Sequence, residues 1–272
     1  MQKQKIPVAV EVHLASKLKI ISWNVNSLRA REPLVQRLIQ EEKPDIICLQ
    51  ELKIDDKIYV SDFFKPYSYN TISQNQKSYN GVSISYQEEM PIKDISFSEL
   101  NKLQARNNVL LLEKKGIALV NNYFPNGNPI DTEKFSYKIN WMDLLYNQIK
   151  QLKKNYEVII TGDFNVIPRD EDAHDIKKYR KDALAQPETR KEFYKFLNLD
   201  LLDVFESEPK KNSYTFFDYK TYKFGKEEGI RIDFFLISPF LKNKIMKIKV
   251  LKEYRDMERP SDHCPILMDL NI

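Results

Sequence analysis

Short apolar runs separated by an amphipathic segment constrain this fold more than any other feature of the sequence. Residues 19–23 and 46–49 are apolar and rich in β-branched side chains, which predicts two strands, the second of them buried on both faces. Between them, the apolar spacing of residues 34–39 predicts a helix that Pro33 opens in its first turn and residues 43–45 end. Strand, helix and strand within about 30 residues form one βαβ-like unit.

The alternation of strands and helices continues to the C-terminus, with no Pro-, Gly- or Ser-rich linker on the way. A second unit is predicted to begin near Asp131, and its helix is indicated by the apolar spacing of residues 141–149, which places one face in a core. The other expected elements are a helix at 190–197 and strands at 81–86, 108–113, 117–123, 157–160, near Tyr214, 232–237 and 266–270. One α/β domain of two similar halves, residues 18–272, is therefore favoured over two domains, with residues 1–17 as a flexible N-terminal extension.

Composition limits the phosphate chemistry that the chain can use. Hydrophobic residues make up 42% of the sequence, enough for a sizeable core in a chain of 272 residues. The net charge, 43 − 39 = +4, does not by itself indicate a nucleic-acid-binding protein. With only 6 Gly against 13 Pro, a Gly-rich phosphate loop is not expected, so phosphate must be bound by side chains or by a metal.

The cysteines and the longest apolar runs indicate a cytoplasmic protein. Cys48 lies inside an apolar run and is expected to be a buried thiol, and its distance from Cys264 in the sequence excludes a CxxC zinc motif. The apolar run at residues 6–10 is too short for a signal peptide, and no run approaches the ~18 apolar residues of a membrane span. In a bacterial cell, the expected place is the cytoplasm in association with the nucleoid.

Amide and carboxylate residues follow the predicted strands directly. The positions are Asn24, Asn26, Gln50, Glu51, Asp163 and Asn165, together with Asp233 inside a strand and Asp262 and His263 just before one. Ligands collect at strand ends in α/β folds because the loops leave the core there together. We therefore expect these positions, which are distant in the sequence, to converge.

The chemistry of that set favours a hard cation. Several carboxylates and amide oxygens with a single His suit Mg²⁺ or Mn²⁺ better than zinc. Asp233 lies in an otherwise apolar strand and needs a partner, for which His263 is the natural candidate. Taken singly, the asparagines could make Asx turns, Glu51 could be a solvated loop residue, and Asp163 could be a turn residue.

Eight segments in a fixed order resemble the exonuclease III family of apurinic/apyrimidinic endonucleases, within the endonuclease/exonuclease/phosphatase superfamily. They are SWNVNSLRA (22–30), LQELK (49–53), YNGV (79–82), NYFPNG (122–127), GDFN (162–165), TFFDY (215–219), RID (231–233) and PSDHCP (260–265). The resemblance covers about Leu18 to the C-terminus. It implies a four-layer α/β sandwich in which two packed, mixed β-sheets are flanked by helices.

The resemblance also implies a role for each matching residue. Glu51, with Asn24 nearby, would hold Mg²⁺ against the scissile phosphate, and Asp163 would deprotonate the attacking water. The implied catalytic residues are Tyr123, Asp163, Asn165, Asp233 and His263. The implied metal-site residues are Asn24, Glu51, Asp163, Asn165, Asp262 and His263.

Six further residues are expected to contact DNA. They are Asn26, Lys53, Arg106, Asn126, Lys138 and Phe216. Phe216 stands where bacterial relatives commonly place a Trp that packs on the abasic sugar. Ser27 stands where the family often has Gly, which is expected to alter the turn after Asn26 slightly.

The implied function is DNA repair. The enzyme would cleave the phosphodiester 5′ to abasic sites in duplex DNA by Mg²⁺-assisted attack of water, leaving a 3′-OH and a 5′-phosphate. It would act as a monomer on duplexes with abasic or 3′-blocked sites, and 3′-phosphodiesterase and 3′→5′ exonuclease activities stay open. Two alternatives are a phosphodiesterase or phosphatase of the superfamily with another substrate, and an inactive relative that regulates by binding nucleic acid.

Overall fold

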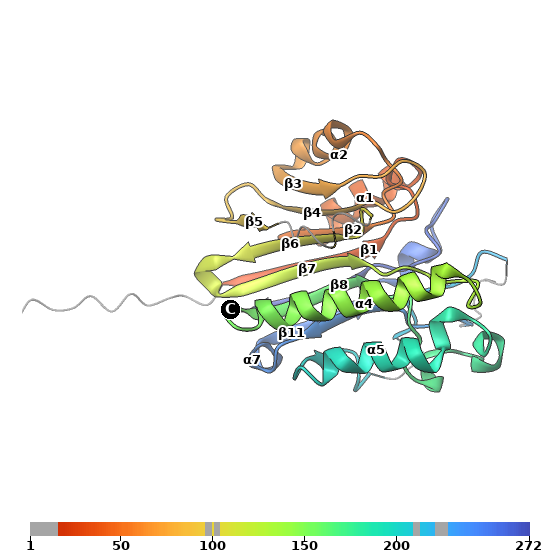
Figure 1. Cartoon of the computed structure of the whole chain (residues 1–272). Helices are drawn as coiled ribbons and strands as arrows, with labels where there is room; N and C mark the ends of the chain where they lie inside the picture. The colour runs from red at the N-terminus through yellow and green to blue at the C-terminus, as the bar shows by residue number, and fades with distance from the viewer. Residues whose placement is uncertain (1–15, 96–99, 101–103, 209–212, 221–227) are drawn as a thin grey trace, which may run out of the picture.

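Two six-stranded β-sheets pack face to face in the computed structural model, which describes residues 16–272 except 96–99, 101–103, 209–212 and 221–227 (Figure 1). The first sheet runs β11 (Ile245–Val250), β12 (Ile266–Asn271), β1 (Lys17–Asn24), β2 (Ile46–Gln50), β4 (Val82–Gln87) and β3 (Tyr69–Gln74). The second runs β5 (Lys93–Ile95), β6 (Asn107–Leu112), β7 (Ile117–Tyr123), β8 (Glu157–Asp163), β10 (Asp233–Ile237) and β9 (Leu202–Asp203).

The two sheets have the same pattern of strand directions. The central pairs β1–β2 and β7–β8 are parallel, and every other neighbouring pair is antiparallel. Both sheets are therefore mixed, as the resemblance implied. The repeated pattern also agrees with a domain of two similar halves.

Apolar residues of the central strands are buried on both faces of each sheet. In β1, Ile20 belongs to the core between the sheets, whereas Ile21 and Trp23 pack on the helical side. This alternation explains why the central strands read as continuous apolar runs. Cys48 is buried in the core between the sheets, as expected.

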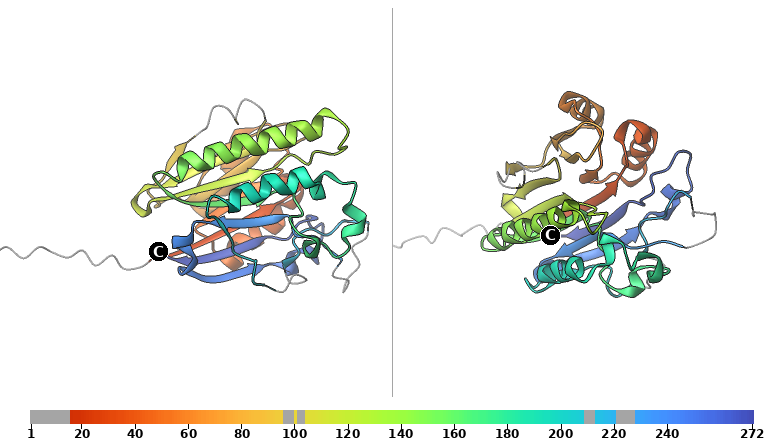
Figure 2. Two further views of the ribbon diagram at one scale, coloured as in Figure 1. Left: turned by 60° about the horizontal axis from the view of Figure 1, so that its bottom comes forward. Right: turned by 45° about the vertical axis from the view of Figure 1, so that its right-hand side comes forward.

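Helices cover the outer face of each sheet and complete the predicted four-layer sandwich (Figure 1). On the first sheet lie α1 (Leu28–Glu42) and α2 (Lys57–Phe64), and on the second lie α4 (Glu133–Leu152) and α5 (Pro187–Leu197). Figure 2 shows this layering from two further directions. The short helix α7 (Pro239–Lys242) connects β10 to β11.

The predicted start of the first helix is wrong. Helix α1 begins at Leu28, so Pro33 lies inside the helix rather than in its first turn. Pro33 is exposed, and Leu28 is buried on the same apolar face as Val35, one heptad further along. Burial of Leu28 extends the helix although Pro33 cannot donate a hydrogen bond. The predicted end is confirmed, because Lys43 adopts the left-handed conformation and its N–H bonds to the carbonyl of Ile39.

Other differences lie at the edges of the sheets and in loops. The strand expected near Tyr214 is not formed, and Phe216 instead makes single bridges to Ile230 and His263. Polar edge strands such as β3 were not predicted, because they lack an apolar pattern. Most of the predicted N-terminal extension, 1–17, lies outside the described residues, but Lys17 already belongs to β1. Within the described part of the chain, no helix is long and apolar enough to cross a membrane.

Gly162 provides a test of how closely β7 and β8 approach one another beside the strand ends. Its φ is +126°, and a Cβ atom there would lie 1.9 Å from the carbonyl oxygen of Asn122. Gly162→Ala should therefore lower the free energy of unfolding by about 3 kcal/mol in urea titrations. Gly116→Ala is the matched control, because Gly116 has φ +62° and nothing within 4 Å of its would-be Cβ. Equal losses in the two variants would contradict the steric argument.

Candidate active site

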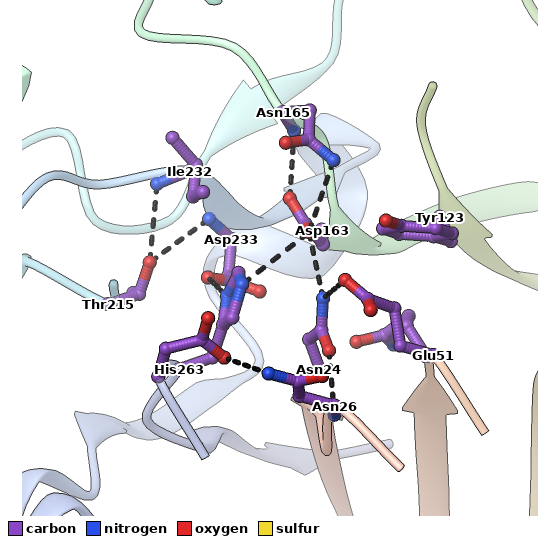
Figure 3. Close-up of polar contacts among 12 residues, drawn as sticks. Asn24, Asn26, Glu51, Tyr123, Asp163, Asn165, Thr215, Ile232, Asp233 and His263 are labelled. Carbon is purple, nitrogen blue, oxygen red and sulfur yellow. Dashed lines mark hydrogen bonds and ion pairs between the residues drawn. The ribbon is translucent and has the colours of Figure 1, made fainter. Parts of the chain in front are cut away.

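The carboxyl ends of the two parallel strand pairs meet at one place. Asn24 ends β1 and Glu51 follows β2, while Tyr123 ends β7 and Asp163 ends β8 (Figure 3). The parallel pairs bring the first two residues together on one sheet and the last two on the other. The predicted convergence at the strand ends is confirmed.

One amide connects the two sheets. Asn24 Nδ2 donates to Glu51 Oε1 and to Asp163 Oδ2, each at 2.9 Å (Figure 3). Asn24 Oδ1 accepts the backbone N–H of Asn26 at 3.0 Å, which fixes the orientation of the amide. A carboxylate from each sheet is thus held on the same side chain.

Asp233 has the partner that its buried position requires. Its Oδ2 lies 2.8 Å from His263 Nδ1, and the other ring nitrogen, Nε2, lies 3.7 Å from Asp163 Oδ2. All three side chains are buried. The imidazole therefore stands between two carboxylates, one on each ring nitrogen.

Charge and burial set the protonation of this group. Burial alone would lower the pKa of His263, but the charges of Asp233 and Asp163 outweigh it and raise the pKa to about 10. Burial raises the pKa of Asp163 to about 7, against the opposing effect of His263. At neutral pH the imidazole is therefore a cation, and Asp163 is poised to exchange a proton.

Glu51 stays ionised for a different reason. Burial pushes its pKa upward, but the charge of Lys53 and the hydrogen bond from Asn24 hold the pKa below its ordinary value. Lys53 Nζ lies 2.9 Å from Glu51 Oε2 and also donates to Asn26 Oδ1. Asn26 Nδ2 in turn donates to Asp262 Oδ1 at 3.1 Å, so Asp262 joins the site through Asn26.

Left-handed backbone conformations concentrate at this site. Asn26 has φ 46°, Glu51 53°, Lys53 55° and Asn165 48°, and Ser27 reaches 91°. Such conformations cost of order 1–3 kcal/mol each at non-Gly residues and persist where the surroundings impose them. The sharp turns at the strand ends aim these side chains into the site. Ser27 takes a left-handed backbone conformation that favours Gly.

The residues present fit a hard divalent cation. Four carboxylates, Glu51, Asp163, Asp233 and Asp262, face two cations, Lys53 and protonated His263, so the formal charge is −4 + 2 = −2 when Asp163 is ionised. Ligand atoms of Asp163, Asp233 and His263 lie within 4.8 Å of one another. Because Asp233 and His263 are paired with each other, Glu51 and Asp163 are the carboxylates best placed to share an ion. Oxygen donors of this kind suit Mg²⁺.

Asn165 and Tyr123 complete the inner part of the site. Asn165 donates to both oxygens of Asp163, from its backbone N–H at 2.9 Å and from Nδ2 at 3.2 Å. Burial, together with the charges of Glu51 and Asp163, raises the pKa of Tyr123 well above its ordinary value, so its hydroxyl stays a hydrogen-bond donor. Arg106 lies over the Tyr123 ring at 4.8 Å and donates to its carbonyl oxygen at 3.3 Å.

The residues expected to contact DNA differ in how exposed they are. Asn126 is exposed at the rim and donates from Nδ2 to Asn165 Oδ1 at 3.3 Å. Phe216 is half-buried, and its ring meets the His263 ring edge-on at a centroid distance of 5.1 Å. Lys138 is placed differently from the expectation, because its side chain is fully buried. It cannot reach a DNA backbone from that position, and its ammonium donates to main-chain carbonyls instead.

Sequence reasoning missed residues that orient the site without entering it. Thr215 Oγ1 accepts the backbone N–H groups of Ile232 and Asp233 at 3.2 and 3.1 Å, which fixes the start of β10. Tyr219 OH accepts from Arg31 at 2.6 Å and donates to the carbonyl of Pro260 at 3.0 Å. Both Thr215 and Tyr219 belong to the TFFDY segment. The sequence therefore identified the motif but did not predict the hydrogen bonds that these two residues make.

Comparisons with known proteins agree with this geometry. The sequence profile of the Endonuclease/Exonuclease/phosphatase family matches residues 21–263. The chain is 30% identical to exodeoxyribonuclease III of Haemophilus influenzae over 92% of its own length and 98% of the relative's. A 3′ phosphatase from Neisseria, solved with a product DNA hairpin, superposes with a TM-score of 0.86 at 32% identity. An AP endonuclease from Archaeoglobus fulgidus superposes with a TM-score of 0.84 at 31% identity. Each of these two superpositions covers 94% of this chain and 100% of the solved structure.

The His263–Asp233 pair makes a prediction for the free protein. In NMR titrations His263 should keep both ring protons at neutral pH and lose one only near pH 10, unlike an ordinary imidazole near 6.5. Asp233→Asn should lower this pKa by about 2, because it removes the nearest negative charge. Asp143→Asn, on the exposed face of α4, is the control and should leave it unchanged.

The same shift predicts the sign of a stability change with pH. Because the folded pKa of about 10 exceeds the ordinary 6.5, the contribution of the protonated pair to the free energy of unfolding is complete below about pH 6.5. It should be lost as the pH rises through 10. A His263 signal that titrates near pH 6.5 in the folded protein would contradict both statements.

Proposed function

The chain belongs to the endonuclease/exonuclease/phosphatase family, and from this membership we propose that it is a metal-dependent DNA-repair nuclease. It cleaves the phosphodiester 5′ to abasic sites in duplex DNA and leaves a 3′-OH and a 5′-phosphate. The observation that carries the proposal is the Asn24 amide that holds Glu51 and Asp163 together, beside the His263–Asp233 pair. A site built this way suits hydrolysis of a phosphate ester.

Each side chain of the site has a chemical task in that reaction. Asp163, with a pKa of about 7, accepts the proton of the attacking water, and Asn165 holds its two oxygens in place. Protonated His263 donates from Nε2 to a phosphate oxygen, while Asp233 fixes the ring through Nδ1. Tyr123 remains a neutral donor toward the phosphate or the leaving oxygen.

Mg²⁺ is the metal that we propose, with Mn²⁺ as a substitute. Glu51 would hold it, supported by Asn24, with Asp163 and Asp262 close by. When bound, the ion supplies Lewis-acid stabilisation of the charge that develops on the phosphate. The surplus of two negative charges at the site supports a divalent ion, and the oxygen donors favour a hard one.

The proposed substrate is duplex DNA with an abasic site. Phe216 stands against His263 and offers an apolar wall to a sugar that lacks its base. Exposed Asn126, Lys53 beside Glu51 and Arg106 beside Tyr123 offer polar and cationic contacts to the backbone around it. Since the site is built within one chain, we propose that the enzyme acts as a monomer, in the cytoplasm.

A second activity is the removal of 3′-blocking groups and of 3′-terminal nucleotides. The likeness to a 3′ phosphatase from Neisseria supports it, at an identity similar to that with the AP endonuclease. The same attack on a phosphate serves both substrates, and the loops around the sugar decide between them. An inactive regulator is disfavoured, because the acidic residues, the His–Asp pair and their mutual orientation are all intact.

The decisive experiment is a metal-titrated assay on a duplex with one abasic site. The same duplex with a recessed 3′ end, a 3′-phosphate duplex and a phosphoinositide are assayed beside it. We expect incision of the abasic strand in Mg²⁺ and none in EDTA. Persistent incision in EDTA, or faster turnover of the phosphoinositide, would overturn the proposal.

Two substitutions test the assigned roles. Asp163→Asn removes the base and His263→Ala removes the cation at the phosphate, and each should lower kcat about 10³-fold while DNA binding persists. Asp143→Asn, an exposed carboxylate on α4, is the matched control and should behave as wild type. Near-normal turnover by either site variant would refute the role given to that residue.

A further inference from the structure

Lys138 is a fully buried lysine that the proposed chemistry does not use. Burial lowers its pKa to about 7, against the opposing charges of Asp182 and Asp163. It lies on α4, and its Nζ is 3.1 Å from the carbonyl oxygen of Asn126, 2.6 Å from that of Asn165 and 3.5 Å from that of Ala183. In its protonated form the ammonium carries three N–H donors and no acceptor, and the three carbonyls face it, the one of Ala183 at the longest distance, 3.5 Å. These carbonyls come from three separate segments, which makes the ammonium a point where the segments are joined.

Two of those segments carry site residues. Asn126 follows β7 and Asn165 follows β8, and their side chains are joined by the bond from Asn126 Nδ2 to Asn165 Oδ1. Asn165 also donates twice to Asp163. A displacement of the main chain at Asn126 or Asn165 would therefore shift the side chains that face the substrate.

The surroundings of Lys138 are shaped around its side chain. Gly127 has φ +86°, and a Cβ there would lie 2.6 Å from Lys138 Cδ and 3.2 Å from the Cβ of Ala183. The absence of a side chain at Gly127 thus makes room for the lysine stem. Thr189 Oγ1 also donates to the Ala183 carbonyl at 2.7 Å, so the third acceptor is held independently of the lysine.

We propose that Lys138 is a positioning residue that sets the placement of Asn126 and Asn165, and through Asn165 the orientation of Asp163. It acts from behind the site and does not contact DNA. The inference rests on the proposed function for its effect on rate, but the contacts of Lys138 with the three carbonyls are a property of the free protein. The sequence-based expectation was a DNA contact at Lys138, and the two roles make opposite predictions.

The first experiment separates kcat from DNA affinity. Lys138→Met removes the three donors and keeps the length of the side chain. We expect kcat on the abasic duplex to fall about 10²-fold, the loss typical of a small misplacement of catalytic groups, with Kd and its salt dependence unchanged. Lys150→Met, an exposed lysine on the same helix, is the control. A raised Kd with a salt slope reduced by about 1 and kcat unchanged would identify a phosphate contact and overturn the proposal.

The second experiment asks whether Lys138 acts through Asn126. Asn126→Ala and Lys138→Met are combined in a double-mutant cycle. If the lysine works by holding Asn126, the double variant should be scarcely slower than the slower single variant. Multiplicative losses would show that the two residues act independently, which would overturn the part of the proposal that runs through Asn126.

The third experiment needs neither substrate nor turnover, so it stands even if the proposed function fails. The NMR amide signals of Asn126 and Asn165, backbone and side chain, are compared in wild type and Lys138→Met without DNA. Both should shift and lose hydrogen-exchange protection, while the signals around β3 should stay in place. If the Met variant does not fold, Lys138→Gln, which keeps two donors, replaces it in all three experiments. Unchanged signals at Asn126 and Asn165 would overturn the proposal.

Discussion

The Asn24 amide that donates to Glu51 and Asp163 is the interaction on which the site depends. Each carboxylate comes from a different sheet, so this contact exists only where the two sheets meet in one register. Carboxylates repel one another, and burial makes the repulsion stronger. The amide, the protonated imidazole of His263 and the ammonium of Lys53 together make the arrangement tolerable.

Packing of the two sheets stabilises a site that is unfavourable by itself. Left-handed conformations at Asn26, Glu51 and Asn165 and the buried charges are unfavourable by themselves. They persist because the parallel strand pairs beneath them are packed on both faces by apolar side chains. Rigid support therefore comes from the centre of each sheet, and function lies in the loops at its ends.

Sequence patterns predicted the central elements well and the periphery poorly. Continuous apolar runs identified β1, β2 and β8, because strands buried on both faces need apolar residues at every position. The start of α1 was predicted wrongly from Pro33, because the preference of proline for a first helical turn was outweighed by the burial of Leu28. In the described part of the chain no strand forms near Tyr214, since Phe216 makes isolated bridges to Ile230 and His263 instead of a continuous ladder. The site residues were found by their order along the chain, whereas Thr215 was missed because its hydroxyl acts on backbone groups of a distant strand.

The sequence by itself determined the class of fold, the donor set and the partnership of Asp233 with His263, because a carboxylate in an apolar strand must find a counter-charge. Only the tertiary structure decided which of these groups contact one another. It placed Asn24 between the two carboxylates, put His263 between Asp233 and Asp163, and buried Lys138 behind Asn126 and Asn165. Composition and spacing give a lysine's position in the chain but not its burial, so they cannot tell a DNA contact from a buried lysine that binds main-chain carbonyls. The distinction depends on which carbonyls the folded chain brings to the ammonium.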